Sequence, residues 1–340
     1  MYYRDGRCKL IILGIETSAD SSSVSLVDEN GLLAEMVVGH SRRHIETVTP
    51  GIEALLRVVN IDISNIDGIA VDVGPGLFTG LRVGVATAKS LCYALGIKAV
   101  ALSSLEVLAG GVLRAVHPGC LHDWIVVPVV DVKRGELFWN TYVVDGSLPY
   151  GSAVSGNGVP SVAALVNGGG GTEVSGTEVS GTEVGDAEVS GTEMGDAEVS
   201  SAEVGGAIAD SVGSIVGNSS DVVHLVATGP PRLSSPRKLV DFLVAATQLD
   251  GLQKKIFIAG SGVLNYSEEF MPFQAHGVVL STPLLATPSA GVVASLGLER
   301  FMIGQYKDYD ELIPQYAREP DAVVNWKRID TARSGTQVVS

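Results

Sequence analysis

A glycine-rich stretch, Gly74-Pro-Gly-Leu-Phe-Thr-Gly-Leu-Arg82, carries the clearest chemical signal in this chain, because it links an apolar run to a helix-like stretch. Backbone N–H groups at such a junction point outward at the positive end of a helix dipole, where they can hold a phosphate or pack against another chain. A Walker loop would need Gly-Lys-Ser/Thr where Leu81-Arg82 stands. The stretch therefore predicts a relative of nucleotide-binding folds, with Gly74, Gly76 and Thr79 as possible phosphate contacts.

Two further stretches could complete a nucleotide site. Glu16-Thr17-Ser18 follows the apolar run 10–15, so Glu16 could hold Mg²⁺ through water while Thr17 and Ser18 meet a phosphate. The alternative is that Glu16 ends a strand and the hydroxyls cap a tight turn. In the second half of the chain, Gly260 and Gly262 form a Gly-x-Gly after an expected strand, which is a weak signal alone.

Histidine spacing suggests one metal site, which the context disfavours. His40 and His44 are four residues apart, but Arg42 and Arg43 lie between them and no Glu follows His40. We expect a surface turn there and no bound metal. The chain also has no Gly-x-Ser-x-Gly elbow, so a peptidase is improbable.

Hydrophobic periodicity places these residues in a mixed α/β chain. Three expected strands come first, followed by a helix that ends near residue 60 and either starts at Thr49-Pro50 or starts near His44 and contains Pro50. Strands at 68–73 and 97–102 then alternate with helices at 79–95 and 104–115. We expect a first lobe over residues 1–115, a second over 116–320 and a polar tail over 321–340. The other expected elements are strands 10–16, 23–28, 32–38, 124–130, 136–144, 223–228 and 255–259, and helices 236–247 and 288–304.

An acidic low-complexity insertion, residues 165–220, interrupts the second lobe. Its core, 171–206, repeats every five residues and contains seven Glu, two Asp and no Lys or Arg. A period of five matches neither helix nor strand, and one Val or Met per repeat cannot build a core. We expect a solvated loop; a short-period β-solenoid is the alternative.

Composition limits the function classes. The net charge is −15, and the repeat accounts for −9 of it. The mildly acidic remainder does not suit a stand-alone nucleic-acid binder. Three scattered cysteines without a Cys-x-x-Cys fit a reduced setting. No apolar run approaches a membrane span, so we expect a cytoplasmic protein that makes no membrane contact.

Several motifs together resemble those of a known family. They are Ile12-Leu-Gly-Ile-Glu-Thr-Ser18, the stretch from His40 to His44, the Gly74–Arg82 stretch, Val85-Ala-Thr-Ala-Lys-Ser-Leu91 and, less closely, residues 131–138. The chain resembles the bacterial TsaB (YeaZ) family within the actin-like ATPase superfamily. The resemblance is dense over about 10–115, thins after 145 and has no place for the insertion. It implies an actin-like ATPase (RNase H-like) fold, with two lobes that each hold a mixed β-sheet covered by helices.

The resemblance implies a role in making threonylcarbamoyladenosine beside the tRNA anticodon. A TsaD-like paralogue would form a heterodimer with this chain, a TsaE-like ATPase would join them, and tRNA would be met indirectly through the complex. TsaD-like proteins carry two metal-binding histidines on the helix after the strand that follows the glycine loop. Ser104 and Leu108 stand at those positions here. We therefore expect no catalytic residues and no cofactor on this chain, with ATP and metal held by the partners.

The expected partner surface is a helix stripe of small residues. Gly80, Gly84, Ala88 and Cys92 are four apart, which lets another helix approach closely. Taken alone, such a stripe would more simply pack on the chain's own sheet. The resemblance favours a pairing surface, which could also self-associate into a homodimer. It would comprise Gly80, Leu81, Gly84, Val85, Ala88, Cys92, Ile52, Leu55 and Leu56.

Two enzymatic alternatives stay open. The chain could be a small actin-fold ATPase or kinase that uses Glu16, Thr17 and the glycine loops. Less plausibly, it could be a glycoprotease-like metallopeptidase that uses His40 and His44. Fold kinship alone does not decide between these functions, because actin-like folds host many activities.

Overall fold

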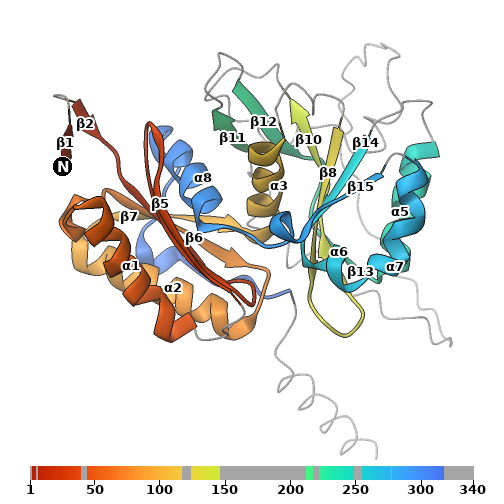
Figure 1. The fold of residues 1–340 in the computed structure, drawn as a ribbon, viewed down its shortest axis with the longest axis horizontal. Helices are drawn as coiled ribbons and strands as arrows, with labels where there is room; N and C mark the ends of the chain where they lie inside the picture. Colours follow the sequence, from red (N-terminus) through yellow and green to blue (C-terminus); the bar gives the residue numbers. More distant parts are fainter. Residues whose placement is uncertain are drawn as a thin grey trace, which may run out of the picture.

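Two β-sheets, one in each lobe, organise the chain (Figure 1). The computed structural model describes residues 2–4, 7–39, 44–116, 124–145, 212–216, 222–248, 255–276 and 278–317. Every structural statement below refers to these residues. A short hairpin, β1 (Tyr2–Arg4) and β2 (Arg7–Lys9), precedes the first sheet.

The first sheet has five strands in the order β5-β4-β3-β6-β7. β3, β4 and β5 form an antiparallel meander, while β6 runs parallel to β3 and β7 runs parallel to β6. This is the RNase H-like order. Helices cover both faces, which explains why β3 and β6 are buried along their whole length. The bounds are Ile12–Glu16 (β3), Ser22–Asp28 (β4), Gly31–Val38 (β5), Gly68–Gly74 (β6) and Lys98–Ser103 (β7).

The second sheet repeats this topology in the order β11-β12-β10-β8-β14-β15. β8, β10 and β12 are antiparallel, and β14 and β15 are parallel to β8. The expected two-lobed α/β fold is therefore confirmed. The bounds are Trp124–Asp131 (β8), Leu137–Trp139 (β9), Tyr142–Asp145 (β10), Val212–Val216 (β11), Val222–Ala227 (β12), Arg232–Ser234 (β13), Lys255–Ala259 (β14) and Val278–Leu280 (β15).

Helices form the outer layers and a central layer between the two sheets (Figure 1). α1 and α2 cover the outer face of the first sheet, α5, α6 and α7 lie on the outer side of the second, and α3 and α8 lie between the sheets. The bounds are His44–Val59 (α1), Phe78–Leu95 (α2), Ser104–Ala115 (α3), Pro236–Gln248 (α5), Ser261–Asn265 (α6), Ser267–Phe270 (α7) and Ala290–Met302 (α8). Short 3₁₀ turns occupy Ile63–Asn65, Met271–His276, Pro283–Leu285 and Tyr309–Glu311.

Two helices, α3 and α8, pack on the sheet of the lobe that does not contain the strand before them in the sequence. α3 packs on the second sheet: Leu105, Leu108 and Val112 share a core cluster with residues of β8, β10 and β14. α8 packs on the first sheet, where Val293 and Leu296 share a cluster with residues of β3, β4, β6 and β7. Each of these helices therefore packs on the sheet built mainly from the other half of the chain.

Most expected elements are present, with informative differences. The first long helix begins at His44 and contains Pro50, which was one of the two alternatives. The strand expected at 136–144 is broken into β9 and β10. β11 falls inside the expected insertion 165–220, so the insertion is shorter than predicted. The repeat 171–206 and the tail 321–340 lie outside the described residues.

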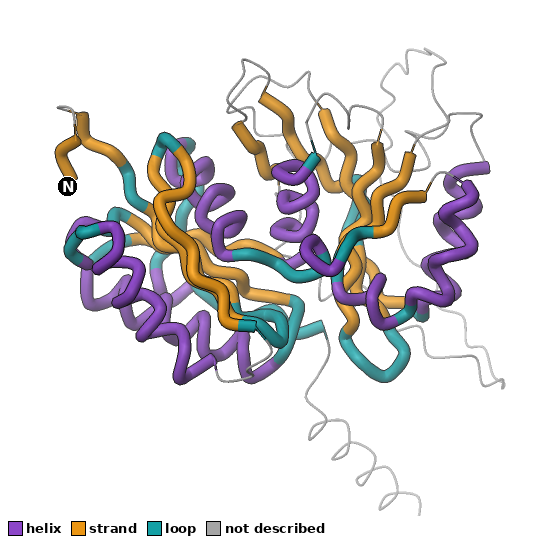
Figure 2. Tube along the Cα trace, in the orientation of Figure 1, coloured by secondary structure: helices purple, strands orange, loops and turns teal. Residues whose placement is uncertain are grey.

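The chain returns to the first lobe after α8 (Figure 2). Ala99 and Lys307 exchange two backbone hydrogen bonds of 3.0 and 2.7 Å at the free edge of β7. Leu312 is then fully buried in the first core cluster. The Gln315 N–H donates to the Val73 carbonyl at 2.6 Å. We call residues 305–317 the return segment. Among the described helices, none combines the length and the hydropathy needed to cross a bilayer.

Candidate functional site

Two buried carboxyl groups meet where the parallel strands β3 and β6 end. Glu16 is 1% exposed and Asp72 is 0% exposed. Glu16 Oε1 accepts hydrogen bonds of 2.6 Å from the Ser18 N–H and hydroxyl. Asp72 Oδ1 accepts bonds of 2.7 Å from the Gly74 N–H and the Ser104 hydroxyl. Glu16 Oε2 and Asp72 Oδ2 are buried and accept no hydrogen bond from the described residues.

This arrangement favours the protonated form of Glu16. Burial raises the pKa of Glu16 well above its ordinary value, and the adjacent Asp72 carboxyl raises it further. Burial also raises the pKa of Asp72, while its hydrogen bonds with Glu16 and Ser104 lower it. The two carboxyls titrate as a pair, and their shared burial favours retention of a proton on that pair. In this structure Glu16 contacts Ser18, and its role as an Mg²⁺ ligand stays a prediction.

The glycine loop lies directly against Thr17 and Ser18, the two residues that follow β3. A Cβ on Gly76 would lie 2.3 Å from the Ser18 carbonyl oxygen, and one on Gly80 would lie 2.0 Å from that of Thr17. The Leu77 N–H donates to the Ser18 carbonyl at 2.7 Å. The Thr17 hydroxyl donates to the Gly80 carbonyl at 2.8 Å. The glycines permit this backbone contact, and the phosphate contacts expected of this loop stay a prediction.

The other residues predicted to contact phosphate in the first lobe differ in their exposure to solvent. Gly74 has a φ of 114°, and a Cβ there would lie 2.4 Å from the Gln315 carbonyl oxygen of the return segment. Glu16, Thr17, Ser18 and Gly74 are buried, and Thr79 is exposed on the first turn of α2. Because of this burial, only Thr79 of the predicted set in the first lobe presents its side chain to solvent.

The second Gly-x-Gly packs in the same manner. Gly260 has a φ of 120°, and a Cβ there would lie 2.2 Å from the Val129 carbonyl oxygen. A Cβ on Gly262 would lie 2.5 Å from Cγ1 of Val129. Because both glycines lack a Cβ, the start of α6 can lie close to β8. Gly76 and Gly80 allow the start of α2 to lie equally close to the residues that follow β3.

The predicted partner stripe faces the interior of its own lobe. Six residues of α2 in that set are buried: Gly80, Leu81, Gly84, Val85, Ala88 and Cys92. Ile52 and Leu55 of α1 are buried as well, and Leu56 is half-buried against the first core cluster. The small residues allow α2 to approach Ile15 of β3 and Thr17 just after it, and the pairing role of the stripe stays a prediction.

The solvent face of the helix pair consists of different residues. On α2 it includes Thr79, Ala86 and Ser90, which are small, and Tyr93, which is 72% exposed. On α1, Ile45 and Val58 are 73% and 78% exposed. A partner that approaches α1 and α2 would meet these side chains. We call the exposed residues of α1 and α2 the outer helix face.

The two positions that would carry metal-binding histidines are occupied by packing residues. Ser104 is fully buried and bonded to Asp72, and Leu108 belongs to the core cluster beneath α3. His44 is buried at the start of α1, its pKa is lowered by burial, and its expected companion His40 lies outside the described residues. No group of three or more His, Cys, Asp or Glu that could hold a metal occurs among the described residues.

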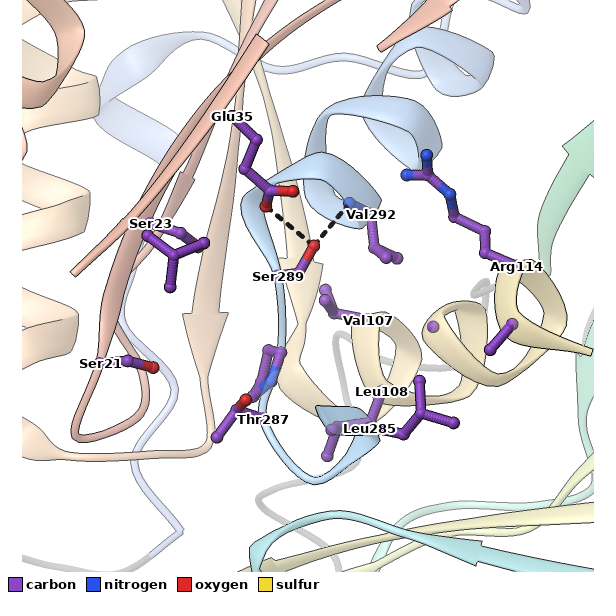
Figure 3. A pocket seen from close by; sticks show the side chains of 14 residues that line it. Ser21, Ser23, Glu35, Val107, Leu108, Arg114, Leu285, Thr287, Ser289 and Val292 are labelled. Atoms are coloured by element: carbon purple, nitrogen blue, oxygen red, sulfur yellow. Dashed lines mark hydrogen bonds between the residues drawn. The ribbon is translucent and has the colours of Figure 1, made fainter. Parts of the chain in front are cut away.

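A cavity of about 360 Å³ opens where the lobes meet (Figure 3). Its walls come from β4 and β5, from α3, and from the start of α8 with the residues before it. Val107, Leu108 and Leu285 give it an apolar side, and Glu35 and Arg114 give it one charge of each sign. The Glu35 carboxylate accepts bonds from the Ser289 hydroxyl at 3.0 Å and the Gly291 N–H at 2.8 Å.

Sequence reasoning missed Asp72 and Glu35. Asp72 interrupts the apolar run 68–73, and a lone charge in an expected buried strand is a usable signal. Glu35 gives no such signal, because its partners are more than 250 positions away in the chain.

Comparison with known proteins agrees with this geometry. Residues 36–194 match the family model described as TsaD, tRNA N6-adenosine threonylcarbamoyltransferase. The tRNA threonylcarbamoyladenosine biosynthesis protein TsaB of Bacillus subtilis is 32% identical over 133 residues, which are 39% of this chain and 55% of that protein. A tRNA N6-adenosine threonylcarbamoyltransferase of Geotalea uraniireducens is 31% identical over 113 residues, 28% of this chain and 33% of that enzyme. The chain thus spans about half the length of TsaB and a third of the transferase.

A solved structure extends the likeness of fold to both lobes. YeaZ from Pseudomonas aeruginosa superposes with a TM-score of 0.55 at 18% sequence identity, covering 90% of this chain and 99% of YeaZ. The sequence match and the shared fold together confirm the resemblance drawn from the glycine loop and its neighbouring motifs. The chain is thus similar in sequence to TsaB of Bacillus subtilis and to the TsaD family model, and similar in fold to YeaZ.

Proposed function

We propose that this chain is a non-catalytic, TsaB-type subunit for threonylcarbamoyl transfer to tRNA in the cytoplasm. It would pair with a TsaD-like paralogue, and a TsaE-like ATPase would join the pair. The observation that carries the proposal is the pair Ser104 and Leu108. Both are buried and engaged in packing at the positions where TsaD-like proteins hold their metal.

The close packing of the glycine loop supports the proposal that this chain is non-catalytic. Glu16 accepts from Ser18, and Asp72 accepts from Gly74 and Ser104. A chain that turned over ATP would need a carboxylate free to act on Mg²⁺, whereas the Glu16 carboxyl is buried and its pKa is raised by that burial. This argument weighs against the ATPase or kinase alternative. ATP and metal would then belong to the partners.

The outer helix face supports the pairing part. Thr79, Ala86 and Ser90 are small and exposed on α2, so the backbone of a partner helix can approach closely. Ile45 and Tyr93 add large exposed apolar area on the same pair of helices. Two-fold pairing of paralogous lobes would bring two such helix pairs together, and the same face could form a homodimer in isolation.

A pairing experiment tests the proposal. The full chain and the TsaD-like paralogue of the same organism are mixed and followed by analytical ultracentrifugation. We expect a heterodimer that Ala86→Arg on α2 weakens at least tenfold, while Ala245→Arg on the exposed side of α5 leaves it intact. Equal pairing by both variants would place the interface elsewhere, and absence of pairing by the unmodified chain would refute the heterodimer.

A further inference from the structure

The cavity between the lobes has two fixed, opposite charges that do not pair with each other. Arg114 donates to the Ser295 hydroxyl at 3.2 Å, and Glu35 accepts from Ser289 and Gly291. Figure 3 shows Glu35 and Arg114 on opposite sides of Val292, at the end of the cavity formed by α8. Since Glu35 on β5 and Arg114 on α3 both line the cavity, a ligand with both charges can bridge them.

The start of α8 is unsuited to a phosphate. The Ala290 N–H donates to the Ser23 hydroxyl at 2.9 Å, and the Gly291 N–H donates to Glu35. The Val292 N–H is capped by the Ser289 hydroxyl. Glu35 thus already supplies the negative charge that a helix N-terminus favours. A second anion there would be repelled, whereas an ammonium group would be attracted to Glu35 Oε2, which accepts no hydrogen bond from the described residues.

The other residues that line the cavity indicate which kind of side chain a ligand would carry. Val107, Leu108 and Leu285 form an apolar side, and Ser21 and Thr287 add hydroxyls. Such a site favours a short aliphatic or hydroxylated side chain over an aromatic or charged one. The volume of about 360 Å³ is at the small end of ligand pockets.

We propose that this cavity binds a free α-amino acid with an aliphatic or hydroxylated side chain. Its ammonium group would face Glu35, its carboxylate would face Arg114, and its side chain would lie on Val107 and Leu108. The inference does not rest on the proposed function, since the site lies within a single chain and needs neither partner nor tRNA.

Calorimetry and ligand-detected NMR on the full chain test the site with L-valine, L-leucine and L-threonine. We expect binding in the range of about 10 μM to 1 mM, which suits a ligand of so few atoms. For L-leucine, two half-analogues give the sharpest comparison. Isopentylamine lacks the carboxylate and 4-methylpentanoate lacks the ammonium group. Each should bind about tenfold more weakly or worse, because each loses one charge-assisted contact.

Variants that remove one charge at a time test whether Glu35 and Arg114 contact the amino acid. Glu35→Gln keeps an oxygen for Gly291 and Ser289, so the fold should persist while amino-acid binding falls about tenfold. Arg114→Gln should weaken binding to a similar degree, and Arg57→Gln on the exposed side of α1 should not. The proposal fails if no amino acid binds at roughly 10 mM, if a half-analogue binds as tightly as L-leucine, or if ATP binds there and the charge variants do not affect amino acids.

Discussion

Glu16 and Asp72 make the stability of this protein depend on pH in a defined direction. In the unfolded chain both carboxyls have pKa values near 4, whereas the folded pair holds a proton to higher pH because it is buried. Folding therefore takes up a proton once the pH exceeds the ordinary carboxyl pKa. The free energy of unfolding then falls as the pH rises, by about 1.4 kcal/mol per pH unit, until the folded pair also loses its proton.

Glu16→Gln should remove this dependence. The Gln amide oxygen can accept the bonds from Ser18, and its nitrogen can donate to Asp72 in place of the shared proton. Between roughly pH 5 and pH 7, urea unfolding should show the unmodified chain losing stability while the variant stays nearly flat. Glu53→Gln, at an exposed site on α1, should keep the slope of the unmodified chain. Equal slopes for Glu16→Gln and the unmodified chain would show that the pair holds no proton.

Gly80 tests whether the glycine loop is a packing device. A Cβ there would lie 2.0 Å from the Thr17 carbonyl oxygen, whereas a Cβ on Gly111 of α3 would meet nothing within 4 Å. Gly80→Ala should destabilise by about 2 kcal/mol or more through overpacking, and Gly111→Ala should stabilise by about 0.5–1 kcal/mol through helix propensity. Thermal unfolding of the two variants decides this; a harmless Gly80→Ala would mean that α2 is free to move away from β3.

At the scale of elements, the sequence predicted what forms but not what each element packs against. The stripe at Gly80, Gly84, Ala88 and Cys92 was recognisable from its spacing, yet a spacing of four is the same for a helix that approaches a partner and one that approaches its own sheet. The exchange of α3 and α8 was also hidden. Both helices are apolar on most sides, so their hydrophobic periodicity does not indicate which sheet they pack against.

The central layer is held by a buried ion pair between the exchanged helices. Arg300 of α8 contacts Glu106 of α3, and their side chains are 12% and 2% exposed. Arg300 also donates to the Ala101 carbonyl at 3.0 Å. Arg300→Met should cost about 3–5 kcal/mol because it leaves Glu106 buried without its cation.

A double substitution and a surface pair serve as controls. Adding Glu106→Gln to Arg300→Met should recover part of the loss, since the buried charge is gone. Lys98→Met breaks an ion pair with Asp308 in which both side chains are about half exposed, so it should cost at most about 1 kcal/mol. Similar losses for Arg300→Met and Lys98→Met in denaturant titrations would contradict a structural role for the central pair.

The return segment buries one side chain in the first core cluster. Leu312 is 0% exposed and the next residue, Ile313, is 69% exposed. Leu312→Ala should destabilise by about 2–5 kcal/mol, while Ile313→Ala should change stability by no more than about 0.5 kcal/mol. Hydrogen exchange at Ala99, whose N–H is bonded to Lys307, should rise in the first variant alone. Unchanged exchange would mean that the segment stays in place without Leu312.

At the scale of the whole molecule, two copies of one topology face each other across α3 and α8. The first copy could be predicted closely, because its apolar runs and turns follow one another without interruption. The second could not, since the acidic repeat separates β10 from β12 by many residues and its short strands have weak periodicity. The cavity between the lobes, with Glu35 and Arg114, depends on contacts from distant parts of the chain and left no sequence signal.

Reconstitution of the tRNA modification tests the central claim most directly. This chain, the TsaD-like paralogue, the TsaE-like ATPase and the adenylate-forming enzyme are combined with unmodified tRNA, ATP–Mg²⁺, threonine and bicarbonate. Nucleoside mass spectrometry then scores threonylcarbamoyladenosine, with each protein omitted in turn. The account predicts product only when both this chain and the paralogue are present. Product without the paralogue would make this chain the transferase, and undiminished product without this chain would deny it any part in the reaction.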